Sequence, residues 1–534
     1  MGLIAALFGA ICAHGADPVV NTTLGPVQGI GPKHLDNSSC FSFYGIPYAA
    51  PPVGKARFRP PSHANPWSHV RPAQTVGPSC LQPFFDGFVN LPPVLERIFE
   101  KFHLFMEPME EDCLFLNIFT PSLPSLQSEN EHLKPVMVWF HGGGMVGGSG
   151  DKQSGVPLYD GRRLCSDGDV IVVTVNYRLG IFGFLTTEEL KQQEGTAGNM
   201  GFQDQRMALE WVQHNARSFG GDPTRVTIFG ESSGGGSVAS HIISKRSQGL
   251  FRGAIMQSGG LWMNRWSDNV KASYDLAQSA GCPNASLACL RALPALKLLH
   301  SVYSSESSVS YGGATADGYE FSENDTPRSI LQRGDFSAVP ILAGTNLNES
   351  AFFACPPPRS AFNETLFRHG LATYLDILPT GDAMNAVVEA YSASKYYGND
   401  WFRAFVDVQT DRDYFCDTRY LLNISARHGA PTYSWRFDHC LGLLSVDRCL
   451  GVPHANDLFF LWGNLDFMLE SRERALGAQM RQWWSAFAWN LSPTVSAMNW
   501  PRYSPGAVQM HINLEQNSHG AHWKEKQCIL LDSI

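Results

Sequence analysis

Residues 219–234 read Phe-Gly-Gly-Asp-Pro-Thr-Arg-Val-Thr-Ile-Phe-Gly-Glu-Ser-Ser-Gly, an apolar strand that runs directly into a serine between two glycines. Residues 226–229 supply the strand, and the small residues after the serine open a helix. Gly230 and Gly234 permit a turn so sharp that the hydroxyl of Ser232 is exposed at the edge of a sheet. Because a serine hydroxyl is a weak nucleophile until geometry and a base activate it, this strand, turn and helix predict a nucleophile elbow.

Apolar, β-branched runs alternate with helix-like segments along the 534-residue chain. We expect strands at 135–140, 170–175, 226–229, 254–257, 339–343 and 432–437. We expect helices at 204–219 and 471–490. This alternation, with nearly continuous apolar strands, predicts an α/β fold whose mainly parallel sheet is covered by helices on both faces. The chain shows no internal repeat and no linker, so we expect residues 17–534 to form a single domain with large insertions.

The first sixteen residues form a short apolar run that ends in small residues, which predicts a cleaved signal peptide at 1–16. No Lys or Arg precedes the run, and a buried first helix or strand is the alternative. No later stretch approaches the roughly 18 apolar residues of a membrane span. Asn-x-Ser/Thr sequons support a secreted glycoprotein and occur at Asn21, Asn37, Asn284, Asn324, Asn348, Asn363, Asn423 and Asn490.

Charge and cysteine usage exclude some partners. The formal charge is −9 and no block of Lys or Arg is present, so we expect no nucleic-acid partner. The 12 cysteines include no Cys-x-x-Cys pair and no Cys/His cluster at zinc spacing. They therefore predict disulfides rather than a metal site, and we expect no cofactor.

A serine on such an elbow needs an acid and a histidine, which follow it in the chain in that order. Glu349 comes just after the apolar run at 339–343, and strand ends are where such sheets place catalytic groups. A solvated loop carboxylate is the alternative for this residue. His454 lies in a loop that leads into an aromatic segment, and His439 beside Cys440 is its main competitor. The residues alone leave both assignments open.

Upstream of the elbow, the expected strand at 135–140 ends in His141 and three glycines. Glycine lets backbone N–H groups approach a substrate oxygen closely, because no Cβ stands in the way. A His-Gly-Gly-Gly run in this position is typical of an oxyanion hole.

Four further stretches complete a family pattern: Glu-Asp-Cys-Leu-Phe-Leu-Asn-Ile-Phe at 111–119, Phe-Tyr-Gly-Ile-Pro-Tyr at 43–48, Asn-Tyr-Arg-Leu-Gly-Ile-Phe-Gly-Phe at 176–184 and Gly-Asn-Met-Gly-Phe-Gln-Asp-Gln-Arg at 198–206. With the elbow, they make the chain resemble the type-B carboxylesterase/lipase family of α/β hydrolases, in character closest to its secreted lipase and sterol-esterase branch. The resemblance covers residues from about 20 to 528 and implies the α/β-hydrolase fold, with a twisted, mostly parallel sheet.

The resemblance also implies site residues. The catalytic triad would be Ser232, Glu349 and His454. The oxyanion donors would be the N–H groups of Gly143, Gly144 and Ser233, where many relatives carry alanine at the last position. Together they imply a serine carboxylic-ester hydrolase that acts through an acyl-enzyme on a small-molecule or lipid ester. Since the histidine must be neutral, activity should fall as the pH drops through about 6 to 7.

By resemblance, disulfides join Cys80 to Cys113, Cys282 to Cys289 and Cys416 to Cys528. Cys440 and Cys449 lie close together in the sequence and could form a fourth, local disulfide. These assignments leave Cys40, Cys165 and Cys355 without partners, so at least one free thiol is expected.

The loop at 80–113 bears on the substrate. Apolar residues from Leu91 to Phe105 recur at helical spacing, with charged residues on the other side. A lid that opens onto a lipid surface is one interpretation, and it favours hydrophobic acyl esters because the stripe would be costly to expose to water. A helix packed permanently on the body, which fits a short-chain carboxylesterase, is the other. Cholinesterases of the family carry a tryptophan in this loop that contacts the quaternary ammonium group. This chain has none there, so the resemblance disfavours a choline ester as substrate.

Three phenylalanines near the expected acid and base, Phe352, Phe353 and Phe459, are candidates to line the substrate site. A non-catalytic adhesion protein of the same family is the remaining alternative. It is disfavoured because all three triad positions are intact. We expect a secreted, extracellular enzyme, and the sequence leaves its oligomeric state open.

Overall fold

The computed structural model describes residues 17–32, 39–82, 108–124, 132–152, 157–304, 314–354, 362–441, 451–504 and 506–534. The predicted signal peptide at 1–16 and the amphipathic stripe of the 80–113 loop lie outside these ranges, as do Cys355 and Cys449.

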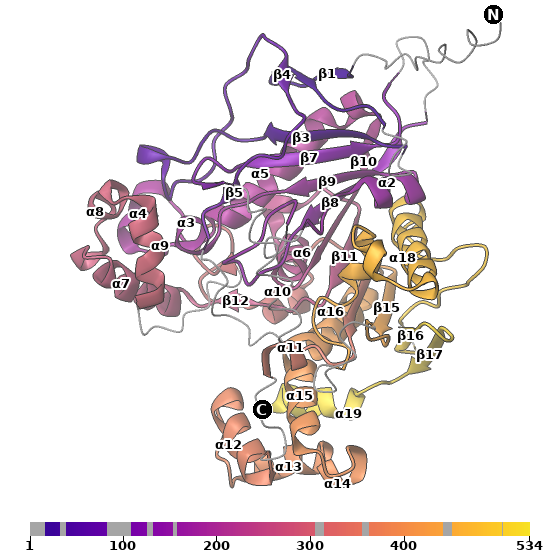
Figure 1. The fold of residues 1–534 in the computed structure, drawn as a ribbon. Helices are drawn as coiled ribbons and strands as arrows, with labels where there is room; N and C mark the ends of the chain where they lie inside the picture. Colours follow the sequence, from indigo (N-terminus) through magenta and orange to yellow (C-terminus); the bar gives the residue numbers. More distant parts are fainter. Residues whose placement is uncertain are drawn as a thin grey trace, which may run out of the picture.

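A ten-stranded sheet crosses the described part of the chain (Figure 1). Its strand order is β17-β16-β15-β14-β11-β10-β8-β9-β7-β3. The strands from β16 to β9 pair in parallel, whereas β17 on one side and β7 and β3 on the other join by antiparallel pairing. The bounds are β3 Phe41–Pro47, β7 Phe115–Thr120, β8 Lys134–Phe140, β9 Ile171–Val175, β10 Gly221–Glu231, β11 Gly253–Gln257, β14 Ile341–Asn346, β15 Thr432–Phe437, β16 Val508–Ile512 and β17 Ser518–Ala521.

Short strands outside this sheet are β1 Val19–Asn21, β2 Pro26–Gln28, β4 Arg71–Pro72, β5 Ser79–Cys80, β6 Met109–Glu110, β12 Met263–Asn264 and β13 Ala314–Thr315. The helices are α2 Arg162–Gly168, α3 Gly180–Phe184, α4 Glu188–Glu194, α5 Met200–Asn215, α6 Ser233–Ile243, α7 Trp266–Ser279, α8 Leu287–Ala292, α9 Ala295–Ser304, α10 Pro327–Arg333, α11 Ala351–Ala354, α12 Glu364–Leu375, α13 Asp382–Ala390, α14 Ala393–Tyr396, α15 Trp401–Thr410, α16 Cys416–Arg427, α17 Leu458–Trp462, α18 Ser471–Asn490 and α19 Glu525–Ser533.

The two faces of the sheet enter separate apolar cores, as β8 illustrates. Its Val136, Val138 and Phe140 belong to one buried cluster, which α5 and α6 complete. Its Met137 and Trp139 belong to the other, which α2, α17 and α18 complete. Successive side chains of a strand point to opposite faces, so an all-apolar strand requires a covered sheet on both sides. The predicted mainly parallel sheet with helices on both faces is confirmed.

The central strands that were predicted from the sequence are present in the structure, with small differences at their ends. The strand expected at 339–343 begins at Ile341, because Pro340 has no N–H to donate to a neighbouring strand, and it continues to Asn346. The strand expected at 226–229 extends from Gly221 to Glu231. The helix expected at 471–490 is α18, while that expected at 204–219 starts four residues earlier and ends in a 3₁₀ turn.

The disulfides Cys80–Cys113, Cys282–Cys289 and Cys416–Cys528 are confirmed. Two other assignments are wrong. Cys40 and Cys165, predicted to lack partners, form a disulfide that ties the start of β3 to α2. Cys440, predicted to pair with Cys449, is a free thiol. The first error arises because β3 is an antiparallel edge strand, and only its pairing with β7 brings Cys40 back toward α2.

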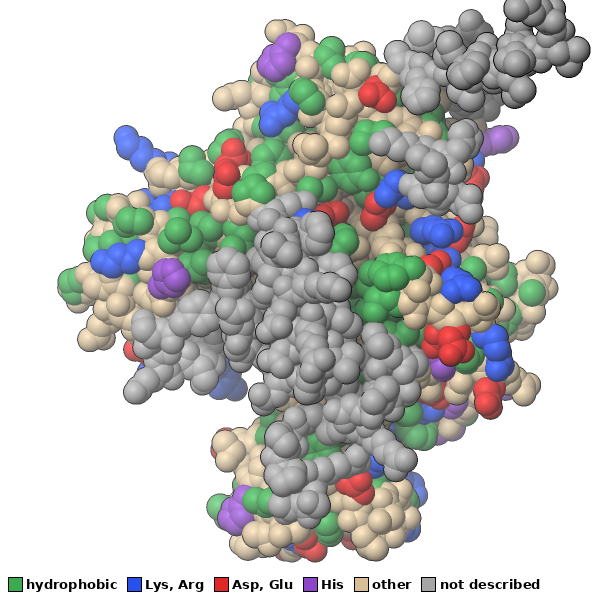
Figure 2. All heavy atoms as spheres, viewed as in Figure 1, with side chains coloured by type: hydrophobic (Ala, Val, Ile, Leu, Met, Phe, Trp, Pro, Cys, Tyr) green, Lys and Arg blue, Asp and Glu red, His purple; other side chains and the backbone are tan. Residues whose placement is uncertain are grey.

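On the face shown in Figure 2, acidic and basic side chains are interspersed over the described surface, with no extended region of one sign. Within the described residues, no helix combines the length and apolar character that a membrane crossing requires.

Candidate active site

Ser232 occupies the turn between β10 and α6, with φ at 57° and ψ at −128°. Two residues before it and two residues after it, only glycine fits. A Cβ at Gly230 would lie 2.5 Å from the carbonyl oxygen of Gly234, and one at Gly234 would lie 2.0 Å from that of Phe140. Such a left-handed backbone at a non-glycine residue costs about 1–3 kcal/mol, and it persists only where the surroundings enforce it. Here the strand, the helix and the neighbouring β8 approach too closely for the turn to relax.

Glu349 and His454 form a buried hydrogen-bonded pair. The Oε2 atom of Glu349 lies 2.5 Å from Nδ1 of His454. Its Oε1 atom accepts a hydrogen bond of 2.5 Å from the backbone N–H of Asn346, at the end of β14. Since a carboxylate only accepts, Nδ1 carries the proton and the neutral ring presents Nε2 as an acceptor.

The Nε2 atom of His454 is buried and has no hydrogen-bond partner among the described residues. It lies 3.1 Å from Oε1 of Glu231, the residue directly before Ser232. The free face of the imidazole therefore opens onto the elbow. The competing histidine, His439, instead has its Nε2 3.0 Å from Oε1 of Glu473, in the first turn of α18.

The glycine run after β8 borders the same turn. A Cβ at Gly142 would lie 2.9 Å from the Cβ of Ser232. The next three residues, Gly143, Gly144 and Met145, have φ values of 107°, 65° and 60°. The carbonyl of Gly143 accepts from two residues beyond the run, while no described residue accepts a hydrogen bond from the N–H of Gly143 or Gly144. These two donors are available to a ligand.

Three buried carboxylates surround His454 and set its charge. Burial raises the pKa of Glu231 to about 8 and that of Asp457 to about 6. Burial lowers the pKa of His454, but Glu231 and Glu349 outweigh this effect and raise it to about 9. Glu231 and Glu349 therefore both stabilise the imidazolium form of His454.

Three residues around His454 were not predicted from the sequence: Glu231, Asp457 and Tyr414. Glu231 directly precedes Ser232, and Asp457 follows His454 by three positions, so their places in the chain could have drawn attention to them. Asp457 accepts hydrogen bonds from Asn346 (2.9 Å) and Gln257 (2.7 Å), so it supports the segment that carries the acid. Tyr414 comes from a π-helical turn at Asp411–Phe415, and its ring centroid lies 5.0 Å from that of His454. No local signal marks that turn.

The three candidate phenylalanines separate into two groups. Phe353 is 58% exposed, and its ring centroid lies 5.3 Å from that of His454. Phe352 packs edge-on against it at 5.2 Å. Phe459 instead packs against the core cluster on the α18 side of the sheet.

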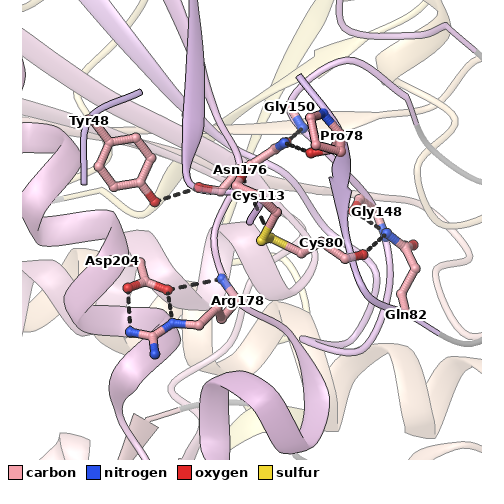
Figure 3. Close-up of a disulfide and its surroundings, with 10 residues drawn as sticks. All are labelled: Tyr48, Pro78, Cys80, Gln82, Cys113, Gly148, Gly150, Asn176, Arg178 and Asp204. Atoms are coloured by element: carbon pink, nitrogen blue, oxygen red, sulfur yellow. Dashed lines mark hydrogen bonds and ion pairs between the residues drawn. A yellow bond between two sulfur atoms is a disulfide. The ribbon is translucent and has the colours of Figure 1, made fainter. Parts of the chain in front are cut away.

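The disulfide Cys80–Cys113 closes the base of the 80–113 loop near Gly148 and Gly150, in the segment that follows the glycine run (Figure 3). The side chain of Gln82 donates to the carbonyl of Gly148 at 2.9 Å and accepts from its N–H at 2.7 Å. The side chain of Asn176 bridges the N–H of Gly150 and the carbonyl of Pro78. The base of the loop is thus fixed to the segment that follows the candidate oxyanion donors.

Among the described residues, no group of three or more His, Cys, Asp or Glu side chains is arranged to hold a metal ion.

Comparisons with known proteins agree on one family. A family model described as the carboxylesterase family matches residues 16–531. The pyrethroid hydrolase Ces2e of Rattus norvegicus is 33% identical over 94% of this chain and 87% of its own. The acetylcholinesterase of Electrophorus electricus is 30% identical over 94% and 86%. Among solved structures, the carboxylesterase EST55 of Geobacillus stearothermophilus matches with a TM-score of 0.80 and 28% identity, over 96% of this chain and 99% of that one.

The charges around His454 predict the pH dependence. For a soluble activated ester, kcat/KM should rise with pH along a limb whose apparent pKa lies above about 7, because only neutral imidazole can accept a proton and the neighbouring carboxylates raise the pKa of His454. This is higher than the sequence alone suggests. The substitution Glu231→Gln removes a charge that stabilises the imidazolium, so the limb should move to lower pH by about 1 unit.

The matched control is Glu515→Gln, at an exposed carboxylate, which should leave the limb in place. A wild-type limb below pH 6, or no displacement in the Glu231 variant, would contradict this account of the site.

Proposed function

We propose, from the premise that this chain belongs to the carboxylesterase family and is a carboxylic-ester hydrolase, that Ser232 is its nucleophile and forms the acyl-enzyme. The observation that carries the proposal is the Nε2 atom of His454: it is buried, has no hydrogen-bond partner among the described residues and lies 3.1 Å from Oε1 of Glu231, the residue before Ser232, while Nδ1 of the same ring contacts Glu349. The α/β-hydrolase fold of the family brings these groups together from the ends of different strands.

In acylation, Nε2 of His454 takes the proton of the Ser232 hydroxyl as Oγ attacks the ester carbonyl. Glu349 keeps the imidazole in the tautomer with its proton on Nδ1 and stabilises the cation that forms. The C–O bond to the alcohol then breaks, and the departing oxygen takes the proton from Nε2. In deacylation, water gives a proton to Nε2 and attacks the acyl carbon, and Ser232 leaves with that proton restored.

The negative charge that develops on the carbonyl oxygen needs donors held in place beforehand. The N–H groups of Gly143, Gly144 and Ser233 are proposed for this task. The first two donate to no described residue, and Ser233 is the first residue of α6, where N–H groups lack helical partners. Loss of one such donor costs roughly 10²–10³ in kcat.

Hydrophobic acyl esters are the proposed substrates. Phe353 is largely exposed although its ring lies against His454, so an apolar group bound beside the imidazole would cover it. The apolar stripe in the sequence of the 80–113 loop supports the same preference and a transient lipid interface, and the base of this loop contacts Gly148, in the segment after the glycine run.

We further propose that the protein is exported. The disulfides among the described residues, including one that closes 125 positions, fit an oxidising compartment. The sequons and the apolar N-terminal run of the sequence point the same way.

The nucleophile can be tested by labelling. Ser232→Ala should lower kcat roughly 10⁶-fold and abolish the mass shift produced by an organophosphate in the intact protein. Ser247→Ala is the matched control, because Ser247 Oγ lies 2.8 Å from Nδ1 of His241, a buried histidine, but does not stand on an elbow. That variant should label fully. An adduct that persists in the Ser232 variant would reject the proposal.

Acyl preference can be tested with p-nitrophenyl esters from butyrate to palmitate, with and without detergent micelles. Phe353→Ala should raise KM several-fold more for the long esters than for butyrate, because it removes apolar contact area beside the acyl group. Phe467→Ala, at another largely exposed phenylalanine, should change neither. Faster turnover of short, soluble esters by the wild-type enzyme under every condition would instead support a short-chain carboxylesterase.

A further inference from the structure

The side chain of Ser233 makes a contact that an alanine at this position could not make. Its Oγ accepts a hydrogen bond of 3.1 Å from the backbone N–H of Met145, the residue that ends the glycine run. Both residues are almost fully buried, at 2% and 3% exposure. The first turn of α6 is thereby tied to the far end of the segment that carries Gly143 and Gly144.

A second contact reaches the near end of the same segment. The hydroxyl of Tyr177 donates to the carbonyl of His141 at 2.6 Å. Burial raises the pKa of this hydroxyl, and the neighbouring Ser233 side chain lowers it in part, which places the two hydroxyls close together. The rings of Tyr177 and His141 also stack, with centroids 4.3 Å apart and planes 17° apart. The hydroxyl of Ser233 therefore accepts from Met145 and adjoins the hydroxyl that holds His141.

The segment between these ties needs support. Glycine adopts both signs of φ readily, so a run of three glycines has many conformations of similar energy. Met145 is a non-glycine residue at φ 60°, a conformation that its own side chain disfavours. The proposed donors must nevertheless point at one position to within a fraction of an ångström, since their contribution depends on being fixed before the charge develops.

We propose that the Ser233 hydroxyl is a positioning residue for the oxyanion hole: by holding Met145 and, through Tyr177, His141, it fixes the direction of the Gly143 and Gly144 N–H groups. The inference rests on the proposed function, and it assigns to the side chain a role separate from that of the Ser233 backbone N–H. The hydroxyl touches no substrate atom. It acts through the glycine run.

The test compares the transition state with the ground state. Ser233→Ala keeps the backbone N–H and removes both ties, so kcat should fall roughly 10- to 100-fold, less than for complete loss of a donor, with KM nearly unchanged. An alkyl trifluoromethyl ketone, which adds to Ser232 and places an oxyanion in the hole, should lose affinity by the same factor as kcat/KM. A role in folding alone would not produce this parallel loss.

Ser237→Ala is the matched control. Ser237 lies one turn further along α6, and its hydroxyl donates to the Ser233 carbonyl and accepts from Gln205 at 2.9 Å. Its removal should lower the unfolding temperature about as much as Ser233→Ala does, but leave kcat and ketone affinity close to wild type. Tyr177→Phe removes only the hydrogen bond to the His141 carbonyl, and it replaces Ser233→Ala in the test if that variant does not fold. It should again lower kcat and ketone affinity together.

A kcat and a ketone affinity that stay within twofold of wild type in folded Ser233→Ala, or in Tyr177→Phe, would overturn the inference. That result would leave the proposed function intact, because the function fails on a different result, an active or labelled Ser232→Ala enzyme.

Discussion

The strained backbone at Ser232 is the constraint on which the site depends. The residue can hold φ at 57° only because Gly230 and Gly234 let β10, α6 and the end of β8 approach within distances that exclude a Cβ. The same close approach sets the glycine run against the nucleophile. Strand order brings the glycine run and Glu349 to the same edge as the elbow, since β8, β10 and β14 lie within one parallel stretch of the sheet and their carboxyl ends face the same side. Packing at the elbow therefore fixes the positions of both the proposed nucleophile, Ser232, and its proposed oxyanion donors.

A second consequence of this geometry is that several carboxylates share one buried space with one imidazole. Glu349 accepts from the backbone N–H of Asn346, and Asp457 accepts from the side chains of Asn346 and Gln257. One oxygen of Glu231 has no hydrogen-bond partner among the described residues and lies 3.1 Å from Nε2 of His454. Burial of carboxylates is costly unless they are paired or hydrogen-bonded, and the fold keeps these three beside the proposed base. The site is thus organised for the charge changes of the reaction rather than for the stability of the resting state.

Much of this arrangement follows from local sequence signals. The elbow was evident because turn, strand and helix each leave a mark within sixteen residues, and Glu349 stood out by its place after an apolar strand. The choice between His454 and His439 could not be made locally. It depends on which carboxylate each ring meets after folding, and His439 meets Glu473 of a helix about 30 positions later. Cys40–Cys165 and Tyr414 escaped for a similar reason, since an antiparallel edge strand and a π-helical turn have no distinct composition.

The central claim is that Ser232, His454 and the donors at Gly143, Gly144 and Ser233 converge on a single tetrahedral centre. A crystal structure of the enzyme with an alkyl phosphonate bound covalently to Ser232 tests this most directly. The account predicts that the phosphoryl oxygen lies about 2.7–3.1 Å from those three backbone nitrogens, with Nε2 of His454 hydrogen-bonded to an oxygen of the adduct. A phosphoryl oxygen turned away from the glycine run, or an imidazole beyond hydrogen-bond reach of the adduct, would contradict it.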